Sequence, residues 1–239
     1  MEKFNPAALS PRTADALSRS TAQFMSRVYG WMTLGIALTG FISFYIGNNP
    51  ELLMSILKNP GIVWGVIIAQ FATVLAFSFL LPRISAPVAS ALYLFYSALF
   101  GVTLSIIFYV YTRQSIAQVF GITGFAFAGL SGFGYVTKRD LGPVGSFCTM
   151  GLFGIIGWSI LSIFFPSMMG GSMGPTFSII GLIVFAGLTA YDTQKIKALN
   201  AAGGYAGDEK KGAIFGALTL YLDFVNMFMM LLRLMGDRK

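Results

Sequence analysis

The chain has 239 residues, of which 56% are hydrophobic and 10% are charged, and its mean hydropathy is +0.74. A soluble domain carries about a quarter charged residues, so this composition excludes an ordinary soluble enzyme, a nucleic-acid-binding domain and a disordered chain. The absence of histidine and the presence of one cysteine also exclude histidine-based triads and zinc sites, cysteine-rich metal sites and an intrachain disulfide.

Residues 1–27 form a polar stretch that we predict to be a cytoplasmic N-terminal segment. Four basic residues and two acidic residues are spread along it. It is too polar to be the core of a signal peptide, and no small-residue cleavage site follows the first apolar run. The sequence therefore predicts an uncleaved first membrane span.

Seven apolar runs follow, each close to the roughly 20 residues that a helix needs to cross a bilayer. They occupy residues 28–47, 61–81, 87–110, 115–136, 141–165, 175–198 and 212–234. The runs are continuously apolar rather than alternating, which favours helices over the strands of an outer-membrane barrel. The sequence thus predicts an all-α membrane protein with a seven-helix transmembrane domain at 28–235 and a short C-terminal tail at 236–239.

The distribution of basic residues predicts the orientation in the membrane. With the N-terminus inside and seven crossings, eleven of the 16 basic residues fall in inside segments, which favours a cytoplasmic N-terminus. Three of the other five lie at the C-terminal end, at Arg233, Arg238 and Lys239. A last segment that does not cross completely would bring these three inside, so both placements of the C-terminus are kept.

Two carboxylates, Asp192 and Asp223, lie inside apolar runs. A charge at membrane depth is costly, and such residues face the interior of a bundle or a water path. In the seventh run, Asp223 belongs to a stripe with helical spacing that is small or polar through most of its length: Gly212, Gly216, Thr219, Asp223, Asn226, Met230 and Arg233. The pattern predicts that this stripe faces neighbouring helices and that the apolar remainder of the helix faces lipid.

The sixth run carries a shorter matching line, from Gly181 through Leu188 or Thr189 to Asp192. Consecutive spans joined by a short loop can lie antiparallel and adjacent, although on straight helices the two aspartates differ in depth by a turn or two. Two like charges that meet in a low dielectric cannot both ionise freely, so the pair would titrate as a unit. Doubly ionised, it repels and suits a hard cation such as Ca²⁺; singly protonated, it can share a hydrogen bond that holds the helices together.

Other roles for these residues stay open at this point. Asp192 can pair with Lys195 one turn on, and Asp223 can bond Asn226, in both cases purely for packing. Arg83, at the inner end of the second span, is either a counter-charge that leans on the carboxylate pair or an ordinary positive-inside anchor.

Four stretches of the chain resemble the Bax inhibitor-1 family of membrane proteins. They are Arg27-Val28-Tyr29-Gly30-Trp31-Met32 with Gly35 and Thr39, Tyr135-Val136-Thr137-Lys138-Arg139-Asp140-Leu141 with Gly145, Val184 to Lys197 around Ala190-Tyr191-Asp192-Thr193, and Leu220-Tyr221-Leu222-Asp223-Phe224 through Arg233. The likeness covers roughly residues 24 to 236. The last two stretches are specific when found together.

The resemblance implies a seven-helix bundle with the last helix at its centre, in the inner membrane of a bacterium. It also implies a pH-sensitive calcium leak governed by two aspartates, which map by motif onto Asp192 and Asp223. An arginine on the second span of the family latches to this pair in the closed state, and here Arg83 is the nearby basic residue, offset by a few positions. The implied partners are the lipid bilayer, calcium ions and protons, and no cofactor is implied beyond the transported calcium.

Two alternatives come from other functional classes. Some bacterial members of the family are associated with the membrane-bound protease FtsH, which suggests a non-conducting regulator whose N-terminal segment, residues 1–27, engages a partner. An intramembrane aspartyl protease also uses two aspartates on neighbouring spans. Tyr191-Asp192 matches one of its motifs, but the Gly-x-Gly-Asp and Pro-Ala-Leu motifs are missing, so we expect no enzymatic activity.

Overall fold

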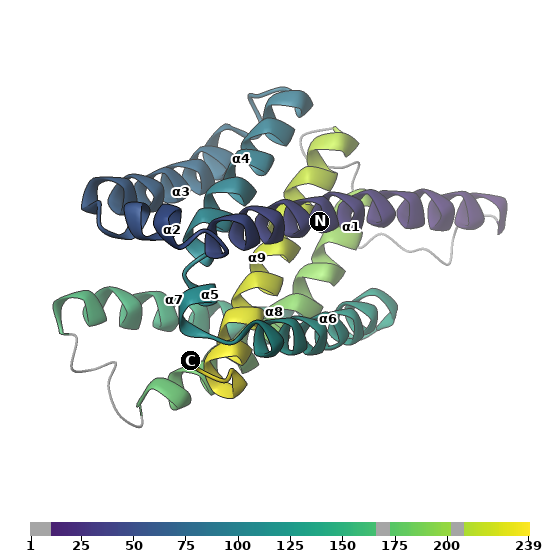
Figure 1. Cartoon of the computed structure of the whole chain (residues 1–239). Coiled ribbons are helices and arrows are strands. Elements are labelled where there is room, and N and C mark those ends of the chain that lie inside the picture. The colour runs from purple at the N-terminus through teal and green to yellow at the C-terminus, as the bar shows by residue number, and fades with distance from the viewer. Residues whose placement is uncertain (1–10, 166–172, 202–207) are drawn as a thin grey trace.

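The computed structural model describes residues 11–165, 173–201 and 208–239. The first part of the polar N-terminal segment and most of the last two inter-span loops lie outside the described residues. Within these ranges the chain forms nine helices and no named strand: α1 (Pro11–Gly47), α2 (Pro50–Leu57), α3 (Pro60–Leu80), α4 (Ala86–Leu104), α5 (Ile107–Val110), α6 (Arg113–Val136), α7 (Gly142–Phe164), α8 (Met173–Ala201) and α9 (Glu209–Met235). Figure 1 shows their arrangement.

Seven segments of the described chain are long and apolar enough to cross a membrane, which confirms the predicted all-α class and the number of spans. Two breaks differ from the prediction. The short helix α2 stands between the first two spans, and the third span is interrupted at Ser105–Ile106, so that α4 and α5 together make it. Proline at the first or second position of α2, α3, α4 and α7 helps to fix where these helices begin.

The first helix begins well before the apolar run that predicted it. α1 starts at Pro11, and its candidate span starts at Ser18 rather than at residue 28. Phe24 and Met25 in the polar stretch are buried within the bundle, so packing carries the helix through residues that composition alone assigns to a solvated segment. The described part of the predicted N-terminal segment, residues 11–27, is therefore the beginning of α1.

The last helix is the central one, as the family resemblance implied. About 67% of its spanning window is buried, whereas the other six spans range from 11% to 39%. α1, α4, α6 and α8 all pack against it, and Figure 1 shows α9 in yellow among them. We expected the apolar remainder of this helix to face lipid, and this was wrong. Neighbouring helices cover most of that apolar surface, in addition to covering the stripe of small and polar residues.

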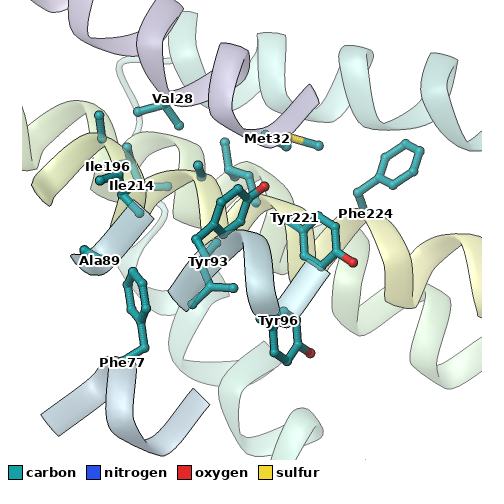
Figure 2. Close-up of a cluster of buried hydrophobic side chains, with 14 of the residues drawn as sticks. Val28, Met32, Phe77, Ala89, Tyr93, Tyr96, Ile196, Ile214, Tyr221 and Phe224 are labelled. Atoms are coloured by element: carbon teal, nitrogen blue, oxygen red, sulfur yellow. The ribbon is translucent and has the colours of Figure 1, made fainter. Parts of the chain in front are cut away.

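A cluster of tyrosines joins α1, α4 and α9 at the core (Figure 2). The rings of Tyr93 and Tyr221 meet edge to face with their centroids 6.0 Å apart. Thr39 donates its hydroxyl proton to the Ser97 carbonyl at 2.8 Å, so the Tyr221 hydroxyl, 2.7 Å away, donates to the Thr39 oxygen. Each buried hydroxyl is thereby satisfied, which stabilises one packing of the three helices.

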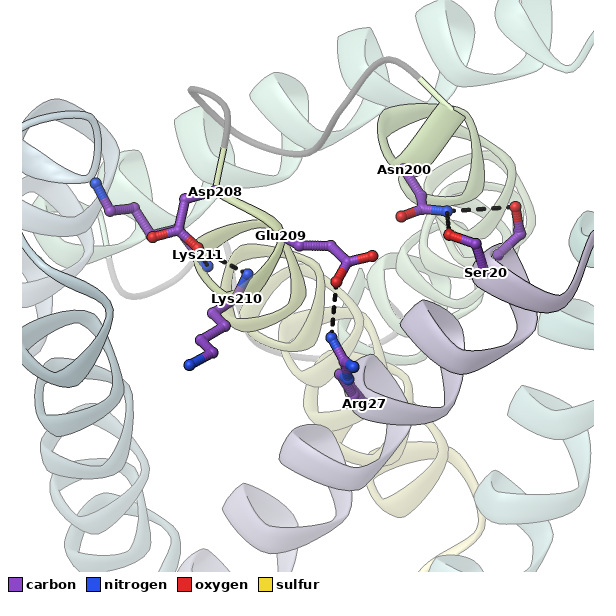
Figure 3. Close-up of polar contacts among 8 residues, drawn as sticks. Ser20, Arg27, Asn200, Asp208, Glu209, Lys210 and Lys211 are labelled. Atoms are coloured by element: carbon purple, nitrogen blue, oxygen red, sulfur yellow. Dashed lines mark hydrogen bonds and ion pairs between the residues drawn. The ribbon is translucent and has the colours of Figure 1, made fainter. Parts of the chain in front are cut away.

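The two ends of α9 are tied to different parts of the chain. At its start, Arg27 Nη1 of α1 lies 2.8 Å from Glu209 Oε2 (Figure 3). Beyond its end, the Lys239 amide donates to the Val110 carbonyl and the Thr112 amide to the Asp237 carbonyl, both at 3.0 Å. The C-terminal tail thus lies beside the connection between the third and fourth spans, on the side opposite the start of α9. Which side is cytoplasmic rests on the charge count and stays a prediction.

Candidate functional site

Where α8 and α9 meet, side chains of one helix pack directly against glycines of the other. A side-chain carbon on Gly181 would lie 2.8 Å from Met230 Sδ, and one on Gly216 would lie 2.8 Å from Ile196 Cγ2. Between these two points the buried Thr189 hydroxyl approaches Met227 Sδ at 3.4 Å. Glycine therefore sets the helix separation near both ends of the contact, and side chains between them are held face to face.

Asp192 lies on α8 and Asp223 on α9, within the range at which the charge of Asp192 acts on Asp223. Asp223 is 4% exposed, and its Oδ2 has no hydrogen-bond partner in the described part of the chain. Asp192 is half-buried. α8 packs along α9 more extensively than any other pair of described helices pack together.

Neither of the packing contacts considered for these aspartates is formed. Asn226 Nδ2 donates to the Leu222 carbonyl of its own helix at 2.8 Å instead of to Asp223. Among the described residues Lys195 makes no ion pair with Asp192; its ammonium lies 5.7 Å from the centroid of the Tyr191 ring. The charge of Lys195 still acts on Asp192 at longer range.

Arg83 is solvent-exposed in the turn between α3 and α4. Its backbone amide donates to the Leu80 carbonyl at 2.8 Å, and its guanidinium forms no salt bridge with any described carboxylate. Arg83 therefore forms no ion pair with either aspartate in the described structure.

A chain of hydroxyl groups beside the pair was not predicted from the sequence. Thr193 donates to the Thr189 carbonyl at 2.8 Å, so Ser131 Oγ, 2.9 Å away, donates to Thr193. The Tyr29 hydroxyl, 2.6 Å from Ser131 Oγ, then donates to Ser131. The chain runs from α1 through α6 to α8, one residue from Asp192. Single hydroxyl residues inside apolar runs were the available signal, but their register across helices is not visible in a sequence.

The Tyr29 end of this hydroxyl chain borders a cleft of about 660 Å³ between α1 and α6. The cleft is lined in part by Tyr29, Ser131 and Tyr135. Beyond Asp223, towards the C-terminal end of α9, a smaller cavity of about 80 Å³ is lined in part by Ser43, Phe224 and Phe228. The Ser43 hydroxyl is buried without a partner in the described structure. Neither aspartate lines these two spaces, but each space includes a residue linked to the pair: Ser131, which bonds Thr193 next to Asp192, and Phe224, which follows Asp223.

We expect Ser131→Ala to lower the free energy of unfolding by about 1–3 kcal/mol, because Tyr29 loses its acceptor in a part-buried site. Ser146→Ala is the control, since this exposed serine bonds only the carbonyl of Gly142 one turn back. Unfolding of the purified protein in mixed micelles measures both. Equal losses in the two variants would contradict a structural role for the hydroxyl chain.

These features define an all-helical, multi-span membrane protein built around a central helix with a buried carboxylate. A family model described as Inhibitor of apoptosis-promoting Bax1 matches residues 21–239. The chain therefore belongs to the Bax inhibitor-1 family, as its four motif stretches indicated.

Relatives in several bacteria match over almost their whole length. The protein named Inner membrane protein YbhL of Escherichia coli K12 is 43% identical over 218 residues, which cover 90% of this chain and 92% of YbhL. An uncharacterized protein of Borreliella burgdorferi is 40% identical over 218 residues, covering 91% of this chain and 93% of that protein. An uncharacterized protein of Deinococcus radiodurans is 36% identical over 218 residues, covering 90% of each.

Proposed function

We propose that this protein is a pH-sensitive cation leak channel of a bacterial inner membrane, with calcium as its main ion, in which Asp192 and Asp223 form the gate. The observation that carries the proposal is the environment of Asp223. Its carboxyl is 4% exposed on the central helix and is unpartnered at Oδ2 among the described residues, and Asp192 acts on it electrostatically. A membrane bundle has no structural need for two neighbouring acids whose charges oppose each other.

The gate follows from the charge state of the pair. With both carboxyls ionised, repulsion separates α8 and α9 and leaves oxygen ligands that suit a hard cation. With one proton bound, the carboxyls can share a hydrogen bond and draw the helices together. Because Ca²⁺ takes about six to eight oxygen ligands, an ion passing two carboxylates would keep water for most of its coordination shell. Such partial dehydration is suited to passage rather than to tight binding.

In this proposal the two spaces near the pair supply the approaches for the ion. The cleft between α1 and α6 leads to Ser131 and Thr193, next to Asp192. The smaller cavity begins at Phe224, next to Asp223. Movement of α8 away from α9 would join the two spaces across the carboxylates.

Calcium uptake into proteoliposomes that enclose a fluorescent indicator tests the function directly. We expect uptake to increase as the pH is raised through the range in which the pair loses its last proton. Liposomes without protein, at each pH, give the background. Uptake at background level at every pH would reject the channel.

A non-conducting regulator of a membrane-bound protease such as FtsH is the second candidate, and the shape of α1 favours it. The first turns of α1 extend past the body of the bundle (Figure 1), where Asp15 and Arg19 are exposed. The Asn200 side-chain amide of α8 donates to Thr21 Oγ1 at 3.3 Å. This bond ties α1 to the bundle at Thr21, beyond the exposed first turns. Removal of residues 1–17 should abolish co-purification of the protease and leave the bundle folded; undiminished co-purification would exclude this interaction.

A further inference from the structure

A cleft of about 750 Å³ lies between α1, α4 and α9, at the end of the bundle where α9 begins. Most of its wall is apolar and comes from Trp31, Leu94 and Ile214, among others. Its charged lining residues are Arg27 and Lys210, and none of the described lining residues is a carboxylate. The cleft therefore combines a cationic mouth with an apolar wall along the spanning helices.

The cations at the mouth are accessible. Lys210 is exposed, and no contact of its ammonium is found in the described structure. Arg27 Nη1 donates to Glu209 Oε2 at 2.8 Å, and the two side chains are 50% and 44% exposed, respectively. Water screens an ion pair of that exposure, so its net stabilisation is small. The pair (Figure 3) engages one nitrogen of the guanidinium, which lines the cleft, so its other N–H groups can bind a ligand.

The start of α4 adds to the positive potential at this mouth. Ala86 and Pro87, the first residues of the helix, line the cleft, and the Ser85 side chain makes no capping hydrogen bond. The first turn of a helix presents unpaired N–H groups and a partial positive charge. Arg83, exposed in the preceding turn, lies at the same end of α4.

We propose that this cleft binds one anionic phospholipid, with its phosphate between Arg27 and Lys210 and an acyl chain along Trp31 and Leu94. The cleft combines charged residues at its mouth with an apolar wall, which favours a lipid over a soluble phosphate. A soluble anion would contact only the charged mouth and leave the apolar wall unoccupied. Basic pockets between spanning helices, at the depth of the headgroups, attract anionic headgroups electrostatically. This site is independent of the acidic pair and of ion conduction.

Lipid titration of the purified full-length protein in a neutral detergent, followed by native mass spectrometry, tests the proposal. Phosphatidylglycerol should stay bound more strongly than phosphatidylcholine with the same acyl chains. Lys210→Gln should weaken retention of phosphatidylglycerol about fivefold, the scale of one cation near an anionic surface. Lys211→Gln removes the same charge one position further on, outside the described lining of the cleft, and should have no such effect.

Three outcomes would overturn the proposal. Equal retention of the two lipids would show that the headgroup charge is not recognised. Equal effects of Lys210→Gln and Lys211→Gln would show a diffuse attraction rather than a site in this cleft. Glycerol phosphate, which has the headgroup charge without acyl chains, should not compete at the same concentration; if it competes equally well, the site binds soluble phosphate instead.

Discussion

Asp223→Asn and Asp192→Asn should each reduce calcium uptake at alkaline pH on the order of tenfold, equivalent to about 1.4 kcal/mol, and remove its dependence on pH. Asparagine has the shape of a protonated aspartate and cannot ionise, so either change prevents the doubly charged state that separates α8 from α9. The steepest loss is expected for Asp223, which is 4% exposed on the central helix. Flux in proteoliposomes across a pH series measures both effects.

Asp140→Asn is the matched control for these two variants. This exposed carboxylate accepts a hydrogen bond from the Gly142 amide at 2.8 Å just before α7, and the amide oxygen of asparagine can accept the same bond. Its flux and pH profile should equal those of the wild type. A wild-type pH profile in both Asp192→Asn and Asp223→Asn would remove the pair from the mechanism, whether or not the protein conducts calcium.

The second large effect is expected where α6 crosses α8, at Gly134. A side-chain carbon there would collide with the Ala190 carbonyl oxygen, and a backbone atom cannot rotate away. Gly134→Ala should therefore push the helices apart and cost about 1–3 kcal/mol of unfolding free energy. Ser131, one turn earlier, would move with α6, so the bond to Thr193 beside Asp192 should weaken as well.

Gly132→Ala isolates this steric effect from helix propensity. Gly132 lies on the same helix, but no atom of the described residues is within 4 Å of an added side-chain carbon. There alanine should be neutral or should stabilise the helix by up to about 1 kcal/mol. Unfolding in mixed micelles compares the two variants, and a Gly134→Ala protein as stable as Gly132→Ala would show that the α6–α8 contact is loose.

The membrane spans were predictable from the sequence because continuous hydrophobicity over about 20 residues is a strong signal. The start of α1 was not, since Phe24 and Met25 are apolar residues scattered among charges and only the packed bundle shows that they are buried. The surroundings of α9 were also missed. A polar stripe shows which face meets neighbours, but it does not show that helices cover the other faces too.

The sequence indicated which residues belong to the candidate site, but it did not indicate which of them contact one another. Asp192 and Asp223 stand out because acids are rare in apolar runs, whereas their proximity depends on how α8 and α9 pack. The Tyr29–Ser131–Thr193 chain joins three helices, and isolated hydroxyl residues give no sign of such pairing. Arg83 shows the reverse case: its place in the sequence suggests a counter-charge, yet the turn between α3 and α4 keeps it exposed.

The most direct test of the account is whether Asp192 and Asp223 bind protons as a unit. The chain has six aspartates, so carboxyl-labelled aspartate gives few NMR signals, and single Asp→Asn variants assign them. We predict that the titration curve of Asp192 changes when Asp223 is replaced by asparagine, and that the curve of Asp223 changes in the reciprocal variant. Superimposable curves for each carboxyl, with and without the other, would contradict a shared proton and the gate built on it.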